Sequence, residues 1–337
     1  MNDELLPERG AMAWPNVAPR STSPVRDAHT ESLRRPKPRR FGRRVREALL
    51  GYALILPALV IFGFFVFWPF ARNVYLGFFR TPLSGDGLGR YVGFAQYQKV
   101  LTSEQFLDSL IVTGKFWLLT VPASIILGLL LAVLGHRKLK GMGVYRTLFI
   151  LSLATGAGVA GTIFFTLLNP VVGILRELPG FPDPAPLQNP TWALPSVAMF
   201  VVWLNISLAF IVLSAGLQNV PDDLYEAARI DGAGAIRRFF RITIPMLSPT
   251  LLFVFVVGSI VALIQSYPPI DATSKGGPTG ATTTLPYLLV KTLRGVSPDQ
   301  GKAAVLSVAL FGVALVFTIV QLVFFEKRVT YGSGRDA

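Results

Sequence analysis

The sequence predicts an all-α integral membrane protein with six transmembrane helices and both termini in the cytoplasm. Of the 337 residues, 52% are hydrophobic and only 15% are charged, and the mean hydropathy is +0.52. That composition is too apolar for a soluble chain of this length. Six apolar runs each approach the ~20 residues that a helix needs to cross ~30 Å of hydrocarbon. Because backbone groups in lipid must be hydrogen-bonded internally, each run is expected to be a helix.

The six runs follow one another with connections of different lengths. In chain order they are 48–70, 109–134, 145–168, 193–217, 250–267 and 303–325. Pro57, Pro122 and Pro195 lie within or near the ends of three of these runs and are expected to kink the helices.

The charges of the connections set the predicted orientation. Alternate connections are basic, and their cations are Arg137, Lys138, Lys140, Arg146, Arg229, Arg237, Arg238, Arg241, Lys327 and Arg328. Cytoplasmic loops carry an excess of Lys and Arg, so these connections and both chain ends are predicted to be cytoplasmic. The outward connections have only scattered cations such as Arg72, Arg90 and Lys275.

Residues 1–47 are predicted to form a cytoplasmic, largely disordered basic tail. Residues 1–28 are rich in proline, serine and charge without apolar periodicity, and residues 34–46 read RRPKPRRFGRRVR. The net charge of +13 is compatible with nucleic acid or with an anionic surface. A polybasic segment directly before an apolar run favours anionic membrane lipid as the partner and argues against nucleic acid.

Several chemistries are excluded by residue content. The chain has no cysteine, which excludes disulfides and thiolate catalysis, and its two histidines, His29 and His136, have no partner at metal-ligand spacing. It also lacks the Gly-x-x-x-x-Gly-Lys-Ser/Thr phosphate loop, so it is not expected to bind ATP in that way. We therefore expect no metal site, no cofactor and no enzymatic activity in this chain.

The most informative segment lies between the fourth and fifth runs. Residues 226–245 read EAARIDGAGAIRRFFRITIP, within a predicted loop of residues 218–249. Gly232 and Gly234 predict a bend between two short helices, the second of which should end before Pro245. Asp223 and Glu226 have the spacing of a capping box for the first helix. A compact helical hairpin of this kind suits the groove of a cytoplasmic partner.

This segment resembles the EAA coupling loop of ABC importer permeases of the sugar-permease type. The resemblance lies in Glu-Ala-Ala, Asp-Gly-Ala and Ile-x-Ile-Pro in that order, with Ile244 where leucine is usual. It implies that the loop docks an ATPase. The residues assigned to docking are Glu226, Ala227, Ala228, Asp231, Gly232, Ala233, Ile242 and Pro245.

The same resemblance implies an assembly. Residues 48–331 would be the permease domain and residues 332–337 a cytoplasmic tail, in a bacterial or archaeal cytoplasmic membrane. The expected partners are a second permease subunit, an ABC ATPase dimer that holds ATP and magnesium, and an external solute-binding protein.

A second resemblance concerns the solute. Residues 267–285, YPPIDATSKGGPTGATTTL, and the end of the chain at 325–331 are similar to permeases of sn-glycerol-3-phosphate importers. The implied solutes are sn-glycerol 3-phosphate or glycerophosphodiesters, with a disaccharide such as maltose or trehalose as the alternative.

Polar residues within the apolar runs are candidates for the solute pathway. They are Lys115, Asn205, Ser207 and Gln265. Lys115 could equally snorkel to the membrane surface, and Asn205 could join two helices. A secondary transporter and a lipid-binding scaffold remain as alternatives of a different class. The first would need intramembrane acids, and the six runs have none at their centres.

Overall fold

The computed structural model describes residues 41–80, 89–136, 143, 144, 147, 155–169, 173–177, 180 and 185–325, and it divides into two compact units, Met1–Ile61 and Phe62–Ala337. Several predicted features lie outside the described residues. They are most of the basic tail, the cations of the connection between the second and third runs, most of the start of the third run at 145–154, and the chain end from residue 326, including Lys327 and Arg328.

Four helices are long and apolar enough to cross a membrane, and a bent helix pair makes a fifth candidate, among the residues that the structure describes. The first candidate, Leu49–Leu76, extends six residues beyond the expected end at residue 70. It comprises α1 (Phe41–Phe62) from Leu49 onward, the π-helical turn η1 (Gly63–Phe67) and α2 (Trp68–Leu76).

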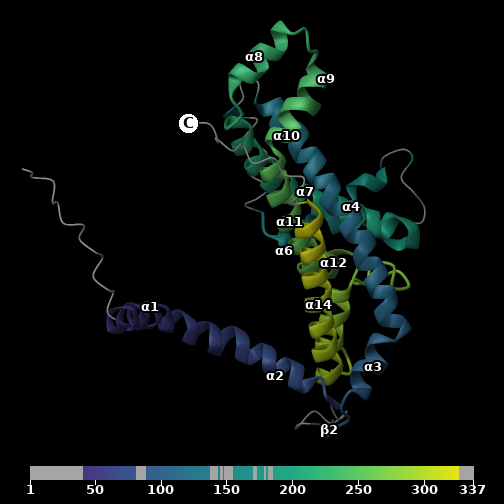
Figure 1. Cartoon of the computed structure of the whole chain (residues 1–337). Helices are drawn as coiled ribbons and strands as arrows, with labels where there is room; N and C mark the ends of the chain where they lie inside the picture. Colours follow the sequence, from purple (N-terminus) through teal and green to yellow (C-terminus); the bar gives the residue numbers. More distant parts are fainter. Residues whose placement is uncertain are drawn as a thin grey trace, which may run out of the picture. The chain divides into compact units, whose positions relative to one another are not determined.

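The second and fourth runs are confirmed as α4 (Glu104–Gly135) and α7 (Pro190–Gln218), which form the centre of the larger unit. Leu129, near the end of α4, packs in one cluster with Leu217, near the end of α7. Phe116 of α4 packs in another with Leu194, near the start of α7. The two helices therefore run parallel (Figure 1).

The third, fifth and sixth runs are also helical where they are described. The third appears as α6 (Ala157–Leu168), the fifth as α11 (Ser248–Ile264) and the sixth as α14 (Gln300–Phe325). Between α6 and α7 lie two 3₁₀ turns, η2 (Ile174–Glu177) and η3 (Pro186–Gln188).

The connection between the fourth and fifth runs contains α8 (Asp222–Ile230), α9 (Ala235–Arg238), the π-helical turn η4 (Phe239–Thr243) and α10 (Ile244–Met246). Ala235–Met246 meets α11 at an angle of 68°. The expectation that the helix ends before Pro245 is wrong. The widened π turn, closed by the Ile244 amide on the Phe239 carbonyl, carries the helix past a proline that cannot donate a hydrogen bond.

The opposite end of the larger unit is built from short elements around the starts of α4 and α14 (Figure 1). They are the antiparallel strands β1 (Phe79–Arg80) and β2 (Arg90–Tyr91), α3 (Ala95–Leu101) and α13 (Leu285–Arg294). The helix α12 (Tyr267–Thr273) lies between α11 and α13 in the chain. Within the segment 267–285, α12 packs against α6 and α7, with Ile270 fully buried.

Candidate functional site

The hairpin of α8 and α9 is shaped by a glycine turn at the end of α8. Gly232 has φ +73°, a left-handed conformation that glycine adopts without a steric penalty. The amide of Ala233 donates to the Ala228 carbonyl (2.8 Å), and the amide of Gly232 donates to the Arg229 carbonyl (3.0 Å). These two bonds form a Schellman motif, which satisfies carbonyls that the helix leaves unpaired. The predicted glycine bend between two short helices is confirmed.

The start of α8 differs from the expected capping box. Pro221 is the N-cap residue, and no side chain caps the helix. Asp222 and Asp223 both lie in the first turn and Arg229 in the last, where their charges complement the helix dipole. Asp223 is therefore inside the helix rather than at the cap. The helix begins two residues earlier than the spacing indicated because Pro221, which cannot donate through its nitrogen, is tolerated just before the first turn.

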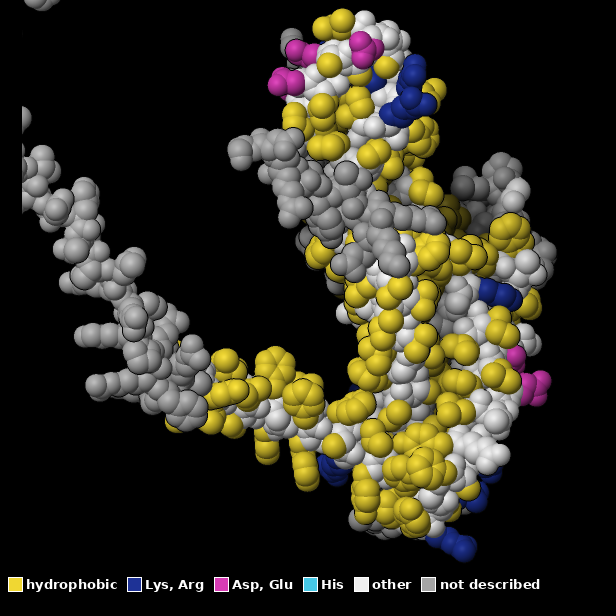
Figure 2. Space-filling view, in the orientation of Figure 1, with side chains coloured by type: hydrophobic (Ala, Val, Ile, Leu, Met, Phe, Trp, Pro, Cys, Tyr) yellow, Lys and Arg dark blue, Asp and Glu magenta, His cyan; other side chains and the backbone are white. Residues whose placement is uncertain are grey.

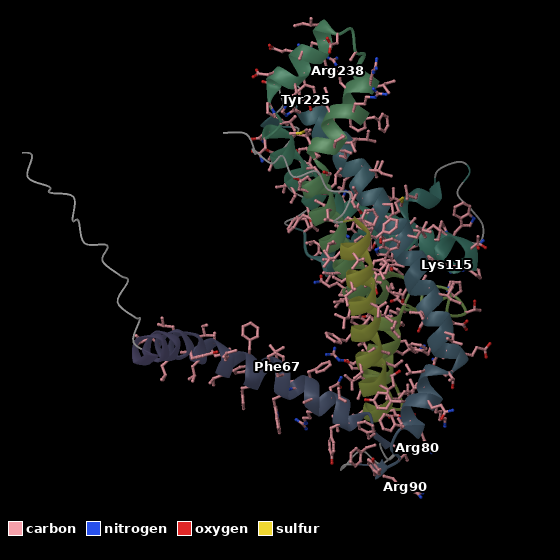
Figure 3. All side chains as sticks on the ribbon, in the orientation of Figure 1. Phe67, Arg80, Arg90, Lys115, Tyr225 and Arg238 are labelled. Atoms are coloured by element: carbon pink, nitrogen blue, oxygen red, sulfur yellow. The ribbon has the colours of Figure 1, made fainter. Side chains whose placement is uncertain are left out.

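A side-chain hydrogen bond joins α8 to the membrane end of the hairpin. The hydroxyls of Tyr225 and Thr243 lie 3.0 Å apart, and Thr243 is buried. Tyr225 also packs against the cluster formed by the ends of α4 and α7 (Figure 3). The sequence analysis missed Tyr225; its position one residue before Glu226, on the face opposite the exposed residues, was the available signal.

The predicted docking residues divide into an exposed and a partly buried group. Glu226, Ala227, Asp231 and Gly232 are exposed, whereas Ala228 and Ala233 are half-buried. The remaining two, Ile242 and Pro245, are also half-buried, and Ile242 packs against the helix bundle. Ile242 and Pro245 therefore support the hairpin, whereas the four exposed residues lie on its surface.

The free surface of the hairpin combines apolar side chains with separated charges. Ile230 is 87% exposed, Ile236 77% and Phe240 64%. Figure 2 shows acidic side chains on one side of this end of the molecule and basic ones on the other. The acids belong to α8 and its end, and most of the cations belong to α9 and η4. Such a surface offers a partner both hydrophobic anchors and a defined charge orientation.

The four candidate pathway residues occupy different environments. Asn205 is half-buried and lines a small cavity of about 30 Å³ between α4, α7 and α11, with Thr120 and Ser124. Ser207 is fully buried in α7 and does not line that cavity.

Lys115 is exposed on α4 (Figure 3). Gln265 is exposed at the end of α11. The structure thus does not gather the four into one site. Its larger cavity, of about 340 Å³, is apolar and lies beside the bend between α10 and α11.

A buried polar contact that sequence reasoning missed joins α4, α11 and α14. The Ser259 hydroxyl donates to the Phe255 carbonyl (2.6 Å) and accepts from Trp117 Nε1 (2.9 Å) and Gln321 Nε2 (2.7 Å). The hydroxyl is thereby saturated. Gln321 is 4% exposed, and its Oε1 has no partner among the described residues. These residues lie on three separate runs, so no local pattern could indicate their contact.

The helices α12 and α13 bring two aromatic rings together. Tyr267 and Tyr287 are stacked with centroids 5.9 Å apart. Burial, and next the neighbouring Asp271 carboxylate, raise the pKa of Tyr267 and of Tyr287. Both phenols are therefore neutral donors at physiological pH.

The fold and the hairpin define a class of transport protein, and comparison with known families agrees. Residues 38–331 match the family described as "Binding-protein-dependent transport system inner membrane component". The chain belongs to this family. It is a multi-pass inner membrane protein, a permease subunit of the ABC transporter class and not an enzyme.

Individual relatives are more specific than the family match. The chain is 37% identical over 288 residues to the "sn-glycerol-3-phosphate transport system permease protein UgpA" of Agrobacterium fabrum, covering 84% of this chain and 97% of that one. The proteins of the same name from Rhizobium meliloti and Pectobacterium atrosepticum are 36% and 33% identical, each over 97% of their length. The chain is thus a UgpA-like member of the family.

Solved structures share the fold. A bacterial ABC transporter involved in the import of the acidic polysaccharide alginate has a chain that matches with a TM-score of 0.66 and 21% identity, covering 86% of this chain and 99% of that one. A chain of the alginate transporter in complex with an alginate pentasaccharide-bound periplasmic protein matches with the same TM-score over 84% of this chain.

Proposed function

We propose that the chain is the permease subunit of an ATP-driven importer for sn-glycerol 3-phosphate or glycerophosphodiesters. Support for the solute comes from relatives named for sn-glycerol-3-phosphate transport, which align over 84% or more of this chain. An external solute-binding protein would deliver the solute, consistent with the name of the family.

The proposed topology has six transmembrane helices with both termini and the α8–α9 hairpin in the cytoplasm. The permease domain would span 48–331, flanked by the basic tail of residues 1–47 and the short tail at 332–337, and the basic tail would lie on anionic lipid. The hairpin supports the orientation because it carries four arginines within 229–241.

The observation that carries the proposed mechanism is the exposed apolar surface of the hairpin. More than half of the surface of Ile230, Ile236 and Phe240 is exposed. The helices α8 and α9 have nine and four residues, and they carry Arg229, Arg237 and Arg238 beside these apolar side chains. Exposed apolar groups of this kind mark a protein interface. The partner would be the ATPase dimer, which binds ATP and magnesium. Its closure would move the hairpin, and η4 and the 68° bend would transmit that movement to α11.

Asn205 is the proposed pathway residue with the best support, because it lines a cavity between three membrane helices. The other three candidates for the solute pathway are proposed on their polarity alone; they are Lys115, Ser207 and Gln265. A second permease subunit would complete the pathway.

Docking is tested by placing a charge on the apolar surface. We expect Ile230→Asp and Ile236→Asp each to reduce co-purification of the ATPase by about tenfold or more, because burying an unpaired carboxylate at an interface is unfavourable. Val296→Asp is the matched control, since Val296 is fully exposed between α13 and α14 at the other end of the unit. Equal loss of ATPase co-purification in all three variants, or no loss in any of them, would refute the docking assignment.

A further inference from the structure

Two arginines face each other across the β1–β2 pair. Arg80 and Arg90 are directly paired in the antiparallel register, and both are exposed. Side chains opposite each other in such a pair have Cβ atoms about 5 Å apart, so like charges there destabilise the pairing. A bound anion would remove this repulsion, because two guanidinium groups can share its oxygens.

The surrounding charge strengthens the argument. From residue 71 to residue 103 the chain has four cations, Arg72, Arg80, Arg90 and Lys99, and one acid, Asp86. Among the residues that the structure describes, no acid pairs with Arg80 or Arg90. This basic segment lies at the end of the unit opposite the α8–α9 hairpin, where membrane proteins ordinarily have fewer cations (Figure 3).

Aromatic rings surround the arginine pair. Phe79 contacts Tyr75 and Tyr91, with ring centroids 4.9 and 5.4 Å away. Tyr75 is 53% exposed, Tyr91 65% and Phe94 77%. Tyrosine and other amphipathic rings gather where hydrocarbon meets headgroups, so these exposures are typical of a membrane interface.

The β1–β2 pair is also held in place at the ends of two membrane helices. It follows directly on the span Leu49–Leu76, and a Cβ added at Gly301, in the first turn of α14, would collide with the Phe79 carbonyl oxygen. The Tyr97 hydroxyl donates to the Val74 carbonyl (2.9 Å), which ties α3 to α2. The arginines are therefore presented from an ordered support at the membrane surface.

We propose that Arg80 and Arg90 together bind the phosphodiester of an anionic phospholipid headgroup, with the neighbouring aromatic rings against its acyl chains. The aromatic rings favour a lipid over a free phosphate compound. The site is independent of the solute that the importer carries.

The test is a lipid titration of the delipidated full-length chain, read by native mass spectrometry. Phosphatidylglycerol should bind, diacylglycerol without a phosphate should not, and sn-glycerol 3-phosphate should not displace the lipid. Arg80→Gln/Arg90→Gln should weaken phosphatidylglycerol binding by about tenfold or more, the effect of losing a charge-assisted hydrogen bond. The matched control Arg72→Gln/Lys99→Gln removes the same charge from exposed, unpaired positions and should change the affinity by less than about threefold.

A melting experiment in lipid-free detergent gives a second readout. The Arg80→Gln/Arg90→Gln variant should melt at or above the temperature of the unsubstituted chain, because cross-strand repulsion is removed. Added phosphatidylglycerol should stabilise only the chain that keeps the pair. The proposal is overturned if both double variants lose lipid equally, if sn-glycerol 3-phosphate displaces the lipid, or if the pair variant is less stable without lipid.

Discussion

Gly232 determines the geometry of the α8–α9 hairpin through its backbone and not through packing. Its φ is +73°, and a Cβ added there would meet no heavy atom of the described residues within 4 Å. A side chain in this conformation costs about 1 to 2 kcal/mol. The structure therefore supports the predicted bend, and no heavy atom of the described residues lies close to a Cβ at this glycine.

Gly232→Ala is therefore expected to weaken ATPase co-purification by shifting the hairpin away from its docking geometry. Gly234→Ala is the matched control, since Gly234 is equally open but has φ −66°. Co-purification should fall only for Gly232→Ala. An equal effect of both substitutions would mean that the space around the glycines matters and not the backbone conformation.

Tyr225 is expected to hold the hairpin to the helix bundle. Tyr225→Phe removes the hydrogen bond to the buried Thr243 hydroxyl and should cost about 1 kcal/mol of local stability. Hydrogen exchange of α8 amides should speed up several-fold. The control is Tyr75→Phe, at an exposed tyrosine in the other end of the unit, which should leave the exchange of α8 amides unchanged. If Tyr75→Phe also speeds exchange in α8, the assigned role of Tyr225 is contradicted.

At the scale of the element, two prolines lie close to helix ends that were placed wrongly by sequence analysis. Pro69 and Pro245 each follow a five-residue π turn by two positions, and the helix continues past both. The sequence shows a proline, which ordinarily ends or kinks a helix. The π turn that accommodates it depends on the packing of the widened segment, and periodicity does not reveal it.

The Ser259 contact makes a prediction for the packing of α4, α11 and α14. Ser259→Ala leaves the Trp117 and Gln321 donors without their acceptor and should destabilise the chain by about 1 to 3 kcal/mol, mostly through unsatisfied buried groups. Adding Gln321→Leu to Ser259→Ala should recover part of that loss, because it removes one of the stranded polar groups. Melting temperatures in detergent measure both. A double variant less stable than Ser259→Ala would contradict this view of the contact.

For the whole molecule, composition and hydropathy predicted the membrane class, and four of the six runs match long helices that could span a membrane. The bend of the α8–α9 hairpin was predictable because its signal is local: two glycines at short range between two short helical segments. The Ser259 contact and the burial of α12 were not predictable, since each depends on residues distant in the sequence. The pairing of Arg80 with Arg90 depends on the register of two strands of two residues each, which are too short to show a periodic pattern.

Topology can be measured directly because the chain has no cysteine. Single cysteines at Ala227 and Val296 should respond oppositely to a membrane-impermeant maleimide added to intact cells. Val296→Cys should be labelled, and Ala227→Cys should react only after permeabilisation. The reverse pattern would invert the proposed orientation, and labelling of both from outside would rule out a cytoplasmic coupling loop.

The measurement that tests the central claim most directly is uptake of labelled sn-glycerol 3-phosphate in the source cells with and without this chain. A Gly232→Trp variant serves as the uncoupled control, and unlabelled glycerophosphodiesters and disaccharides serve as competitors. We predict uptake that requires the chain, fails with Gly232→Trp and is competed by glycerophosphodiesters but not by maltose or trehalose. Unchanged glycerol-phosphate uptake without the chain, together with lost disaccharide uptake, would contradict the assigned solute.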